Sequence, residues 1–395
     1  MGKLLITICL SIFLSLPGNA DLLSFYQTGE AELSADTSYG VGTNWKEIFA
    51  DEYKEMAVAE NGSAYVVNPA GHNVLKFDES GTFQKKFGEK GQEDGKLFFP
   101  SSISILDGQK LLVTDYADNR KLTRFDLDGN FKQVVRTEKA IYSMVPLVDD
   151  RVAYLCQERL HSRDRDETDR KISVFIKDIK TGEEIEATSH VVRDPSFINI
   201  EGKFRISLYA YYKGDVFIES SKGNLLVGVS NRSSIDIYSP ADGSKTGSID
   251  LKIKPRKVTP AFVKKFQDAQ IAKCSKRKDW LHFKTKFLEK ISAAEDFFDE
   301  YLPFYQKLLT DQQGNLLILN ETSPFEEKQN KIELRAYSAT GQFIGQTVLK
   351  QKKLAKLDID MKNMRWYRKM YFGKKAIYLL FGDADTPLKI TKVNL

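Results

Sequence analysis

Polar side chains end three apolar, strand-like segments of the sequence and could supply oxygen ligands. Asn68 ends AYVVN, Asp115 ends LLVTD and Asn320 ends LLILN. Carboxylate and amide oxygens are the ligands that calcium prefers. The same residue types are also favoured in the turns that follow strands. These three residues are therefore candidates for a binding site, with a purely turn-forming role as the competing interpretation.

The histidines offer little metal chemistry. The chain has four, at positions 72, 161, 190 and 282, and none has the close spacing of a ligand pair. His72 follows Gly71 in the loop after Asn68, so we include it as a fourth binding candidate. The sequence contains no nucleophile elbow, phosphate-binding loop or dinucleotide fingerprint in the required context. We therefore predict no catalytic residues and no resident metal or cofactor, with calcium as the alternative.

The elements that must position these candidates form a repeat. Five alternating strands run into a turn that ends on glycine, at Gly81, Gly129, Gly182, Gly243 and Gly341. A near-continuous apolar strand precedes each one, as expected for strands that are buried on both faces. A sixth strand pair, at residues 376–381 and 387–395, has no such turn. A β-sandwich of irregular hairpins has little reason to repeat one pattern six times, so the sequence predicts an all-β, six-bladed β-propeller.

The missing sixth turn predicts how the ring closes. A propeller must pair its last blade with its first or leave an exposed sheet edge. We expect a strand within residues 22–49 to complete the sixth blade beside the C-terminal strand. Residues 194–213 contain a further strand-like stretch, which could extend the third or fourth blade or belong to a seventh.

One segment breaks the β pattern. Residues 259–294 carry apolar side chains at helical spacing, which predicts a helical insertion over about residues 255–300, between blades four and five. The segment is rich in lysine and could present a basic face to an acidic polymer or a membrane surface. Because Asp268, Asp279 and Glu289 interrupt the basic run, we favour a solvated helix whose aromatic side packs on the propeller.

The N-terminus has the pattern of an export signal. Lys3 precedes an apolar run at residues 4–16, and small residues follow up to Ala20. The run is shorter than the ~20 residues that span a bilayer. We therefore predict a signal peptide at residues 1–20, a propeller at residues 21–395 and an exported protein, periplasmic or secreted. A membrane anchor and a buried strand are the alternatives.

Few cysteines and a mild net charge limit other roles. Cleavage would leave only Cys156 and Cys274, which we expect to be unpaired and buried, although one bridge between them is the alternative. The formal net charge of +5 over the full chain does not suggest a nucleic-acid partner.

Residues 74–130 resemble tandem NHL repeats. The shared features are Phe87-Gly88, Gly91, Gly95, Pro100 and the D-x-x-N-R turn of Asp115, Asn119 and Arg120. The stretch LPFYQKLLTDQQGNLLIL, at residues 302–319, is similar to exported bacterial six-bladed propellers. The resemblance implies this fold and export. Members of these groups range from binding scaffolds to hydrolases and lyases, so the fold alone does not assign a function.

We expect an exported, non-catalytic propeller that binds a protein or glycan partner through its loop face. The candidate residues at the mouth of its channel are Asn68, His72, Asp115 and Asn320. The alternative is a calcium-dependent hydrolase or lyase that acts at the same mouth.

Overall fold

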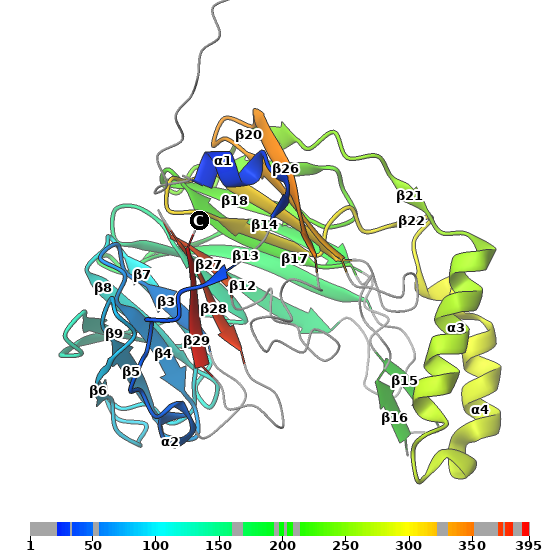
Figure 1. The fold of residues 1–395 in the computed structure, drawn as a ribbon, viewed down its shortest axis with the longest axis horizontal. Helices are drawn as coiled ribbons and strands as arrows, with labels where there is room; N and C mark the ends of the chain where they lie inside the picture. The colour runs from blue at the N-terminus through cyan, green and yellow to red at the C-terminus, as the bar shows by residue number, and fades with distance from the viewer. Residues whose placement is uncertain are drawn as a thin grey trace, which may run out of the picture.

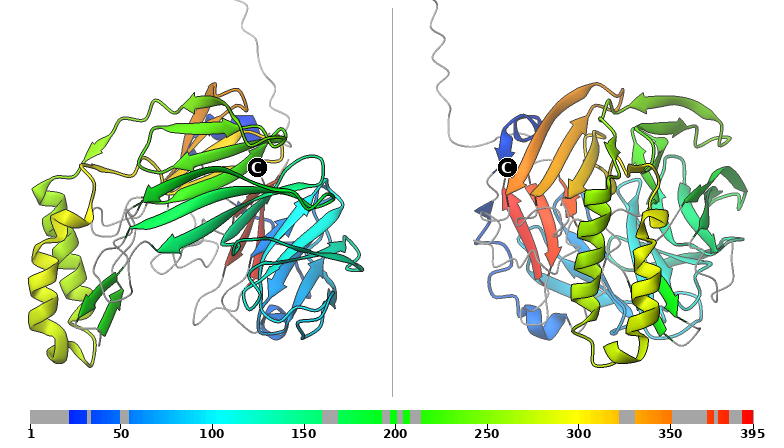
Figure 2. Two further views of the ribbon diagram at one scale, coloured as in Figure 1. Left: turned by 180° about the vertical axis from the view of Figure 1, so that it is seen from behind. Right: turned by 90° about the vertical axis from the view of Figure 1, so that its right-hand side faces the viewer.

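The computed structural model describes residues 22–31, 34–49, 55–159, 169–192, 197–200, 204–207, 214–321, 331–350, 370–373, 376–381 and 389–394. Six largely antiparallel sheets are arranged around a common axis (Figures 1 and 2). The predicted signal peptide lies outside the described residues. Among the described residues, no helix is long and apolar enough to cross a membrane.

Blades one to five are each built on a four-stranded meander, blade six on a three-stranded one, and the first strand of each meander lies nearest the axis. Blades one to three are β3–β6 (Met56–Val58, Ala64–Asn68, Asn73–Phe77, Phe83–Phe87), β7–β10 (Pro100–Leu106, Lys110–Asp115, Lys121–Asp126, Phe131–Arg136) and β11–β14 (Ser143–Pro146, Arg151–Arg159, Arg170–Asp178, Glu184–Val192). Blades four to six are β17–β20 (Val216–Ser221, Asn224–Val229, Ser234–Tyr238, Lys245–Asp250), β23–β26 (Lys307–Thr310, Leu316–Glu321, Lys331–Tyr337, Phe343–Lys350) and β27–β29 (Met370–Phe372, Ala376–Phe381, Lys389–Asn394) with β2 (Ser34–Ala35). The predicted six-bladed propeller is confirmed.

The hydrophobic core is divided among the junctions between blades. Each of six buried apolar clusters joins two neighbouring blades, including one that joins blade six to blade one. The second strand of each blade lies between two such clusters, which explains its continuous apolar sequence: Leu111, Leu112 and Val113 of β8 are all completely buried. The repeat therefore determines both the strands and the packing between them.

A predicted glycine turn shows why that residue is required. Gly129, between β9 and β10, has a φ of +79°, and a Cβ atom there would lie 2.4 Å from the ring of Phe87. Asp126 accepts hydrogen bonds from the backbone N–H groups of Asp128 at 3.0 Å and Asn130 at 2.8 Å. The turn thus combines a left-handed backbone with close packing against blade one.

The N-terminal segment closes the ring. β2 pairs antiparallel with β29 as the outermost strand of blade six, which is the predicted closure. Before it, β1 (Gly29–Ala31) pairs parallel with β26 as a fifth strand of blade five. The short helix α1 (Leu22–Tyr26) buries three side chains, and the hydroxyl of Tyr26 donates to Asp311 at 2.9 Å. The N-terminal segment therefore adds a strand to both blade five and blade six, whereas a strand was expected in blade six alone. Helix α2 (Trp45–Ile48) follows it.

The connections divide the ring into two unlike faces. The turns between the first and second strands and between the third and fourth strands of each blade emerge on one side, which we call the turn face. The turns between the second and third strands, and the connections between blades, emerge on the other side, the loop face. The glycine turns lie on the turn face. Both insertions and the strand ends at Asn68, Asp115 and Asn320 lie on the loop face.

The insertion between blades four and five contains two long helices where one was expected. A short ribbon of β21 (Arg256–Lys257) and β22 (Tyr301–Leu302) leads to α3 (Pro260–Cys274), α4 (Trp280–Ser292) and a 3-10 turn at Ala294–Phe297. Thr259 caps α3 by accepting from the Phe262 N–H at 3.2 Å, and Pro260 occupies the first turn. The helical pattern is interrupted at residues 275–279, where the chain reverses.

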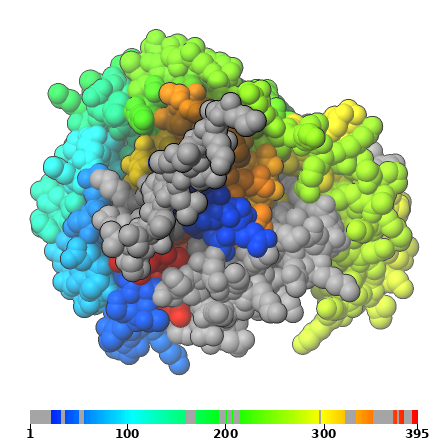
Figure 3. Space-filling model, turned by 45° about the horizontal axis from the view of Figure 1, so that its top comes forward, coloured from blue at the N-terminus to red at the C-terminus, as the bar shows by residue number. Residues whose placement is uncertain are grey.

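The strand-like stretch after blade three neither extends a blade nor begins a seventh. β15 (Phe197–Ile200) and β16 (Phe204–Ser207) form a separate hairpin. Its Ile200 and Ile206 share one core with the aromatic side chains of α3 and α4, among them Phe266, Phe283 and Phe287. The expectation that the helical aromatics pack on the propeller is therefore wrong, because a second insertion covers them. We call this hairpin and residues 256–302 the insertion subdomain; it forms a lobe beside the ring (Figures 2 and 3).

Both cysteines that follow the predicted signal peptide are unpaired and buried, as expected. Cys156 lies at the junction of blades two and three, and Cys274 lies in the core of the insertion subdomain.

Candidate functional site

The innermost strands of all six blades surround a central cavity of about 850 Å³. This volume lies within the range of roughly 300–1,000 Å³ that is common for small-molecule sites. The walls mix apolar side chains with hydroxyl and amide groups, including those of Ser102, Ser104 and Gln157. The cavity is thus large enough to admit a small molecule or one end of a larger ligand, and its walls can form hydrogen bonds with it.

One carboxyl group inside the cavity has an unusual environment. Glu219 of β17 accepts a hydrogen bond at 3.1 Å from the hydroxyl of Thr310 on the neighbouring inner strand, β23. Burial raises the pKa of Glu219 to about 7, although the nearby positive charge of Lys307 opposes the shift. Asp215, also on the wall, is paired with the buried guanidinium of Arg170 at 3.6 Å.

Four exposed aromatic side chains lie on the loop face of blades one to three. Phe98 and Phe99 end the connection from blade one to blade two, Tyr116 follows β8, and Tyr142 precedes β11. Their exposed fractions are 36%, 40%, 74% and 55%, and both tyrosines also line the cavity. The rings of Phe99 and Tyr116 meet edge to face, with centroids 6.2 Å apart. We call these four residues the aromatic patch; its two tyrosines lie at the mouth of the central cavity, and Phe99 contacts Tyr116.

Two of the candidate residues hold this patch in place. The buried carboxylate of Asp115 accepts hydrogen bonds from the backbone N–H groups of Phe98, of Phe99 at 2.9 Å and of Ala117 at 3.0 Å. His72, with a φ of +56°, directs Nδ1 to the carbonyl oxygen of Phe98. Asp115 of blade two and His72 of blade one therefore both hydrogen-bond the backbone at Phe98. The structure brings them together around Phe98.

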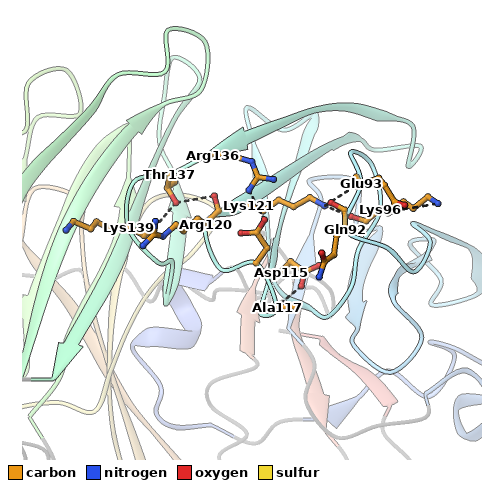
Figure 4. Close-up of polar contacts among 11 residues, drawn as sticks. Gln92, Glu93, Lys96, Asp115, Ala117, Arg120, Lys121, Arg136, Thr137 and Lys139 are labelled. Carbon is orange, nitrogen blue, oxygen red and sulfur yellow. Dashed lines mark hydrogen bonds and ion pairs between the residues drawn. The ribbon is translucent and has the colours of Figure 1, made fainter. Parts of the chain in front are cut away.

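A buried lysine, which the sequence reasoning missed, stabilises the same connection (Figure 4). Lys121 is 1% exposed, and its ammonium group donates to the carbonyl oxygens of Gln92 at 3.2 Å, Glu93 at 3.0 Å and Lys96 at 2.8 Å. A signal for it existed, because Lys121 is in phase with the buried residues of β9, such as Phe125. Burying an ammonium group costs desolvation free energy. The hydrogen bonds to the three converging carbonyl oxygens offset this cost.

An ion pair braces the loop that follows Asp115. The guanidinium of Arg136 lies 2.7 Å from the carboxylate of Asp118, and this interaction holds the pKa of Asp118 below its usual value. The backbone N–H of Tyr116 donates to the carbonyl of Phe99 at 2.8 Å. The peptide segments that carry three of the four aromatic residues are therefore linked to one another.

The remaining candidates fasten other connections of the loop face. The side chain of Asn68 donates to Asn73 at 3.2 Å and accepts from the backbone of Gly71 at 3.3 Å. Asn320, on blade five, donates to the carbonyl of Phe304 at 2.8 Å. It is separated by blade six from the candidates on blades one and two. None of the four candidates lines the cavity. A direct role for them in ligand binding stays a prediction.

The described residues contain no cluster of three or more His, Cys, Asp or Glu side chains that could hold a metal ion. The carboxylate of Asp115 is poorly suited to bind a metal ion, because both of its oxygens already accept hydrogen bonds from backbone N–H groups.

A comparison with protein-family models agrees with this architecture. Residues 54–227 match a protein-family model described as a 6-bladed beta-propeller. Among solved structures, the chain is similar to a protein of Bacteroides fragilis described as exported, with 11% identity, a TM-score of 0.49 and coverage of 96% of this chain and 97% of that one. A Bacteroides vulgatus protein matches with 12% identity, a TM-score of 0.47 and coverage of 93% and 99%.

An enzyme appears among the more distant matches. Virginiamycin B lyase of Staphylococcus aureus has 8% identity and a TM-score of 0.39, with coverage of 86% of this chain and 94% of that one. A search of curated proteins found no match. The six sheets of the ring and the family match over residues 54–227 identify the chain as a six-bladed β-propeller.

Proposed function

We propose that this chain is an exported, non-catalytic propeller that binds a protein or glycan partner through its loop face, with the aromatic patch at the centre of contact. The observation that carries the proposal is the gathering of four exposed aromatic residues on the loop face of blades one to three, two of which line the cavity. Exposed apolar groups clustered on one face mark interaction sites, and tyrosine and other aromatic anchors are enriched at binding hot spots.

The hydrogen bonds beneath the patch support this function. Asp115, His72 and Lys121 fix the backbone that carries Phe98 and Phe99 before any ligand arrives. A preformed site loses less conformational entropy on binding, so more of the contact energy appears as affinity. Flat aromatic rings suit both the apolar face of a sugar and the side chains of a peptide.

Two arguments favour binding over catalysis. The sequence has no nucleophile motif, and the oxygens of Asp115, the acidic member of the calcium candidates, are already engaged by backbone N–H groups. The proposed export, to the periplasm or the medium, rests on the signal-like pattern of residues 1–20.

A ligand screen with paired variants tests the proposal. The purified chain is screened against a glycan array and against a panel of exported proteins, and each hit is titrated by calorimetry. We expect the double variant Tyr116→Ala/Tyr142→Ala to weaken binding by roughly 30-fold or more, since truncating a hot-spot residue costs about 2 kcal/mol. Phe343→Ala is the matched control, because Phe343 is 52% exposed and begins β26 at the turn face. Equal affinity in the patch variant and the control would overturn the proposal.

A further inference from the structure

The turn between α3 and α4 concentrates positive charge at one end of the insertion subdomain. The fourteen residues at 273–286 include six lysines or arginines and one acidic residue, Asp279. Their net charge equals the formal net charge of the entire chain, +5. This end lies opposite the β21–β22 ribbon that joins the subdomain to the ring (Figure 1). We call residues 275–286 the helical tip.

Part of this charge has no local counter-charge. Arg277 is held by Asp279, with Nη2 2.7 Å from Oδ2 and Nε 2.9 Å from Oδ1, and Lys286 pairs with Glu289 at 3.4 Å. Lys276, Lys278 and Lys284 make no ion pair or hydrogen bond with the described residues. Elsewhere on α3 the acidic residues noted in the sequence do neutralise the surface, as where Lys264 pairs with Asp268 at 2.7 Å. Lys276, Lys278 and Lys284 therefore leave positive charge at the tip without a counter-charge among the described residues.

An exposed apolar side chain lies among these lysines. Leu281, in the first turn of α4, is 83% exposed, the highest value among the large hydrophobic residues of the described chain. Lys284 follows it at a spacing of three residues, which places the two side chains next to each other on the helix surface. Trp280 anchors the turn by packing on Phe283 and Phe287, with ring centroids 5.4 Å and 5.6 Å away.

We propose that the helical tip docks on the surface of an anionic lipid membrane, with Leu281 inserted among the headgroups and Lys278 and Lys284 beside the phosphates. Each lysine near an anionic surface contributes about 1 kcal/mol, and the apolar side chain adds a term that a soluble polyanion cannot supply. The leucine is the reason to favour a membrane over an acidic polymer. This docking is independent of the aromatic patch.

Vesicle sedimentation tests the docking. The purified full chain is mixed with vesicles of phosphatidylcholine alone or of phosphatidylcholine with phosphatidylglycerol, at low and at high ionic strength. We expect binding only to the anionic vesicles, and weaker binding at high ionic strength because salt screens the lysines. The double variant Lys278→Gln/Lys284→Gln should lower the partition coefficient by roughly 30-fold, and Leu281→Ser should lower it about tenfold.

The double variant Lys85→Gln/Lys86→Gln is the matched control. It removes the same charge from exposed positions of β6, on the outer strand of blade one, and should leave partitioning unchanged. Near-ultraviolet circular dichroism of each variant verifies the fold. Equal binding to neutral vesicles, or an equal loss in the control, would overturn the proposal. Binding to heparin that Leu281→Ser leaves intact, without binding to anionic vesicles, would assign the tip to acidic polymers and would also overturn it.

Discussion

Replacing Asp115 with alanine removes an acceptor on which three backbone N–H groups converge. A hydrogen bond to a charged group contributes about 1.5–3 kcal/mol, and the orphaned donors of Phe98 and Phe99 are only partly accessible to replacement water. We therefore expect Asp115→Ala to lower the free energy of unfolding by about 3–5 kcal/mol. Asp115→Asn keeps one acceptor oxygen but turns an amide toward one of the donors, so about half of that loss is expected.

Urea unfolding, followed by circular dichroism, measures both variants against the wild type. The same titration in the presence of a calcium chelator separates the two interpretations of Asp115. A backbone-capping carboxylate leaves the wild-type midpoint unchanged in chelator. A calcium ligand would make the wild-type midpoint fall in chelator while that of Asp115→Ala stays constant. That pattern, or a loss below about 1 kcal/mol for Asp115→Ala, would refute the reasoning.

Three further perturbations follow from the same contacts. Lys121→Met should cost about 3–5 kcal/mol of unfolding free energy because three buried carbonyls lose their donor, whereas Lys85→Met should cost little; equal midpoints in urea would contradict this. Because the pKa of Glu219 is raised from 4.5 to about 7 in the folded chain, its stabilising contribution is complete below about pH 4.5 and is lost as the pH rises to about 7. Glu219→Gln should therefore become more stable than the wild type by about 3 kcal/mol above pH 7, and a pH-independent difference would exclude the buried-carboxyl interpretation. Deleting residues 1–35 removes the three buried side chains of α1 together with β1 and β2, and should cost about 5 kcal/mol or more; a truncated chain with the wild-type urea midpoint would disprove closure by this segment.

The local pattern of the chain was sufficient to predict the ring. Alternating strands, glycine turns such as that at Gly129 and apolar second strands recur along the sequence, and each blade buries its apolar faces against its sequence neighbours. The closure of the ring by the N-terminal segment could also be predicted from the sequence, because the sixth strand pair lacks its turn and an exposed edge strand has to be paired. The parallel addition of β1 to blade five was not accessible, since three residues carry no register signal of their own.

The candidate site was only partly accessible from the sequence. Asp115, at a strand end, and His72, in a turn, were recognisable as candidates, but their hydrogen bonds to the backbone of Phe98 depend on how two blades meet. The aromatic patch was missed because its four members come from three connections and share no regular spacing along the chain.

The sequence by itself predicted six blades, the turn chemistry and the place of the helical insertion, because these depend on contacts between neighbouring segments. A seventh blade was excluded only when the structure showed β15 and β16 as a separate hairpin. Only the tertiary structure decided which side chains share an environment. It buried Lys121 under three carbonyls, placed Glu219 in a cavity that raises its pKa, and covered the helical aromatics with a hairpin from another connection. Those outcomes depend on desolvation and on long-range contacts. The spacing of residues placed Lys121 on a buried face of β9 but could not show which carbonyl groups it meets there.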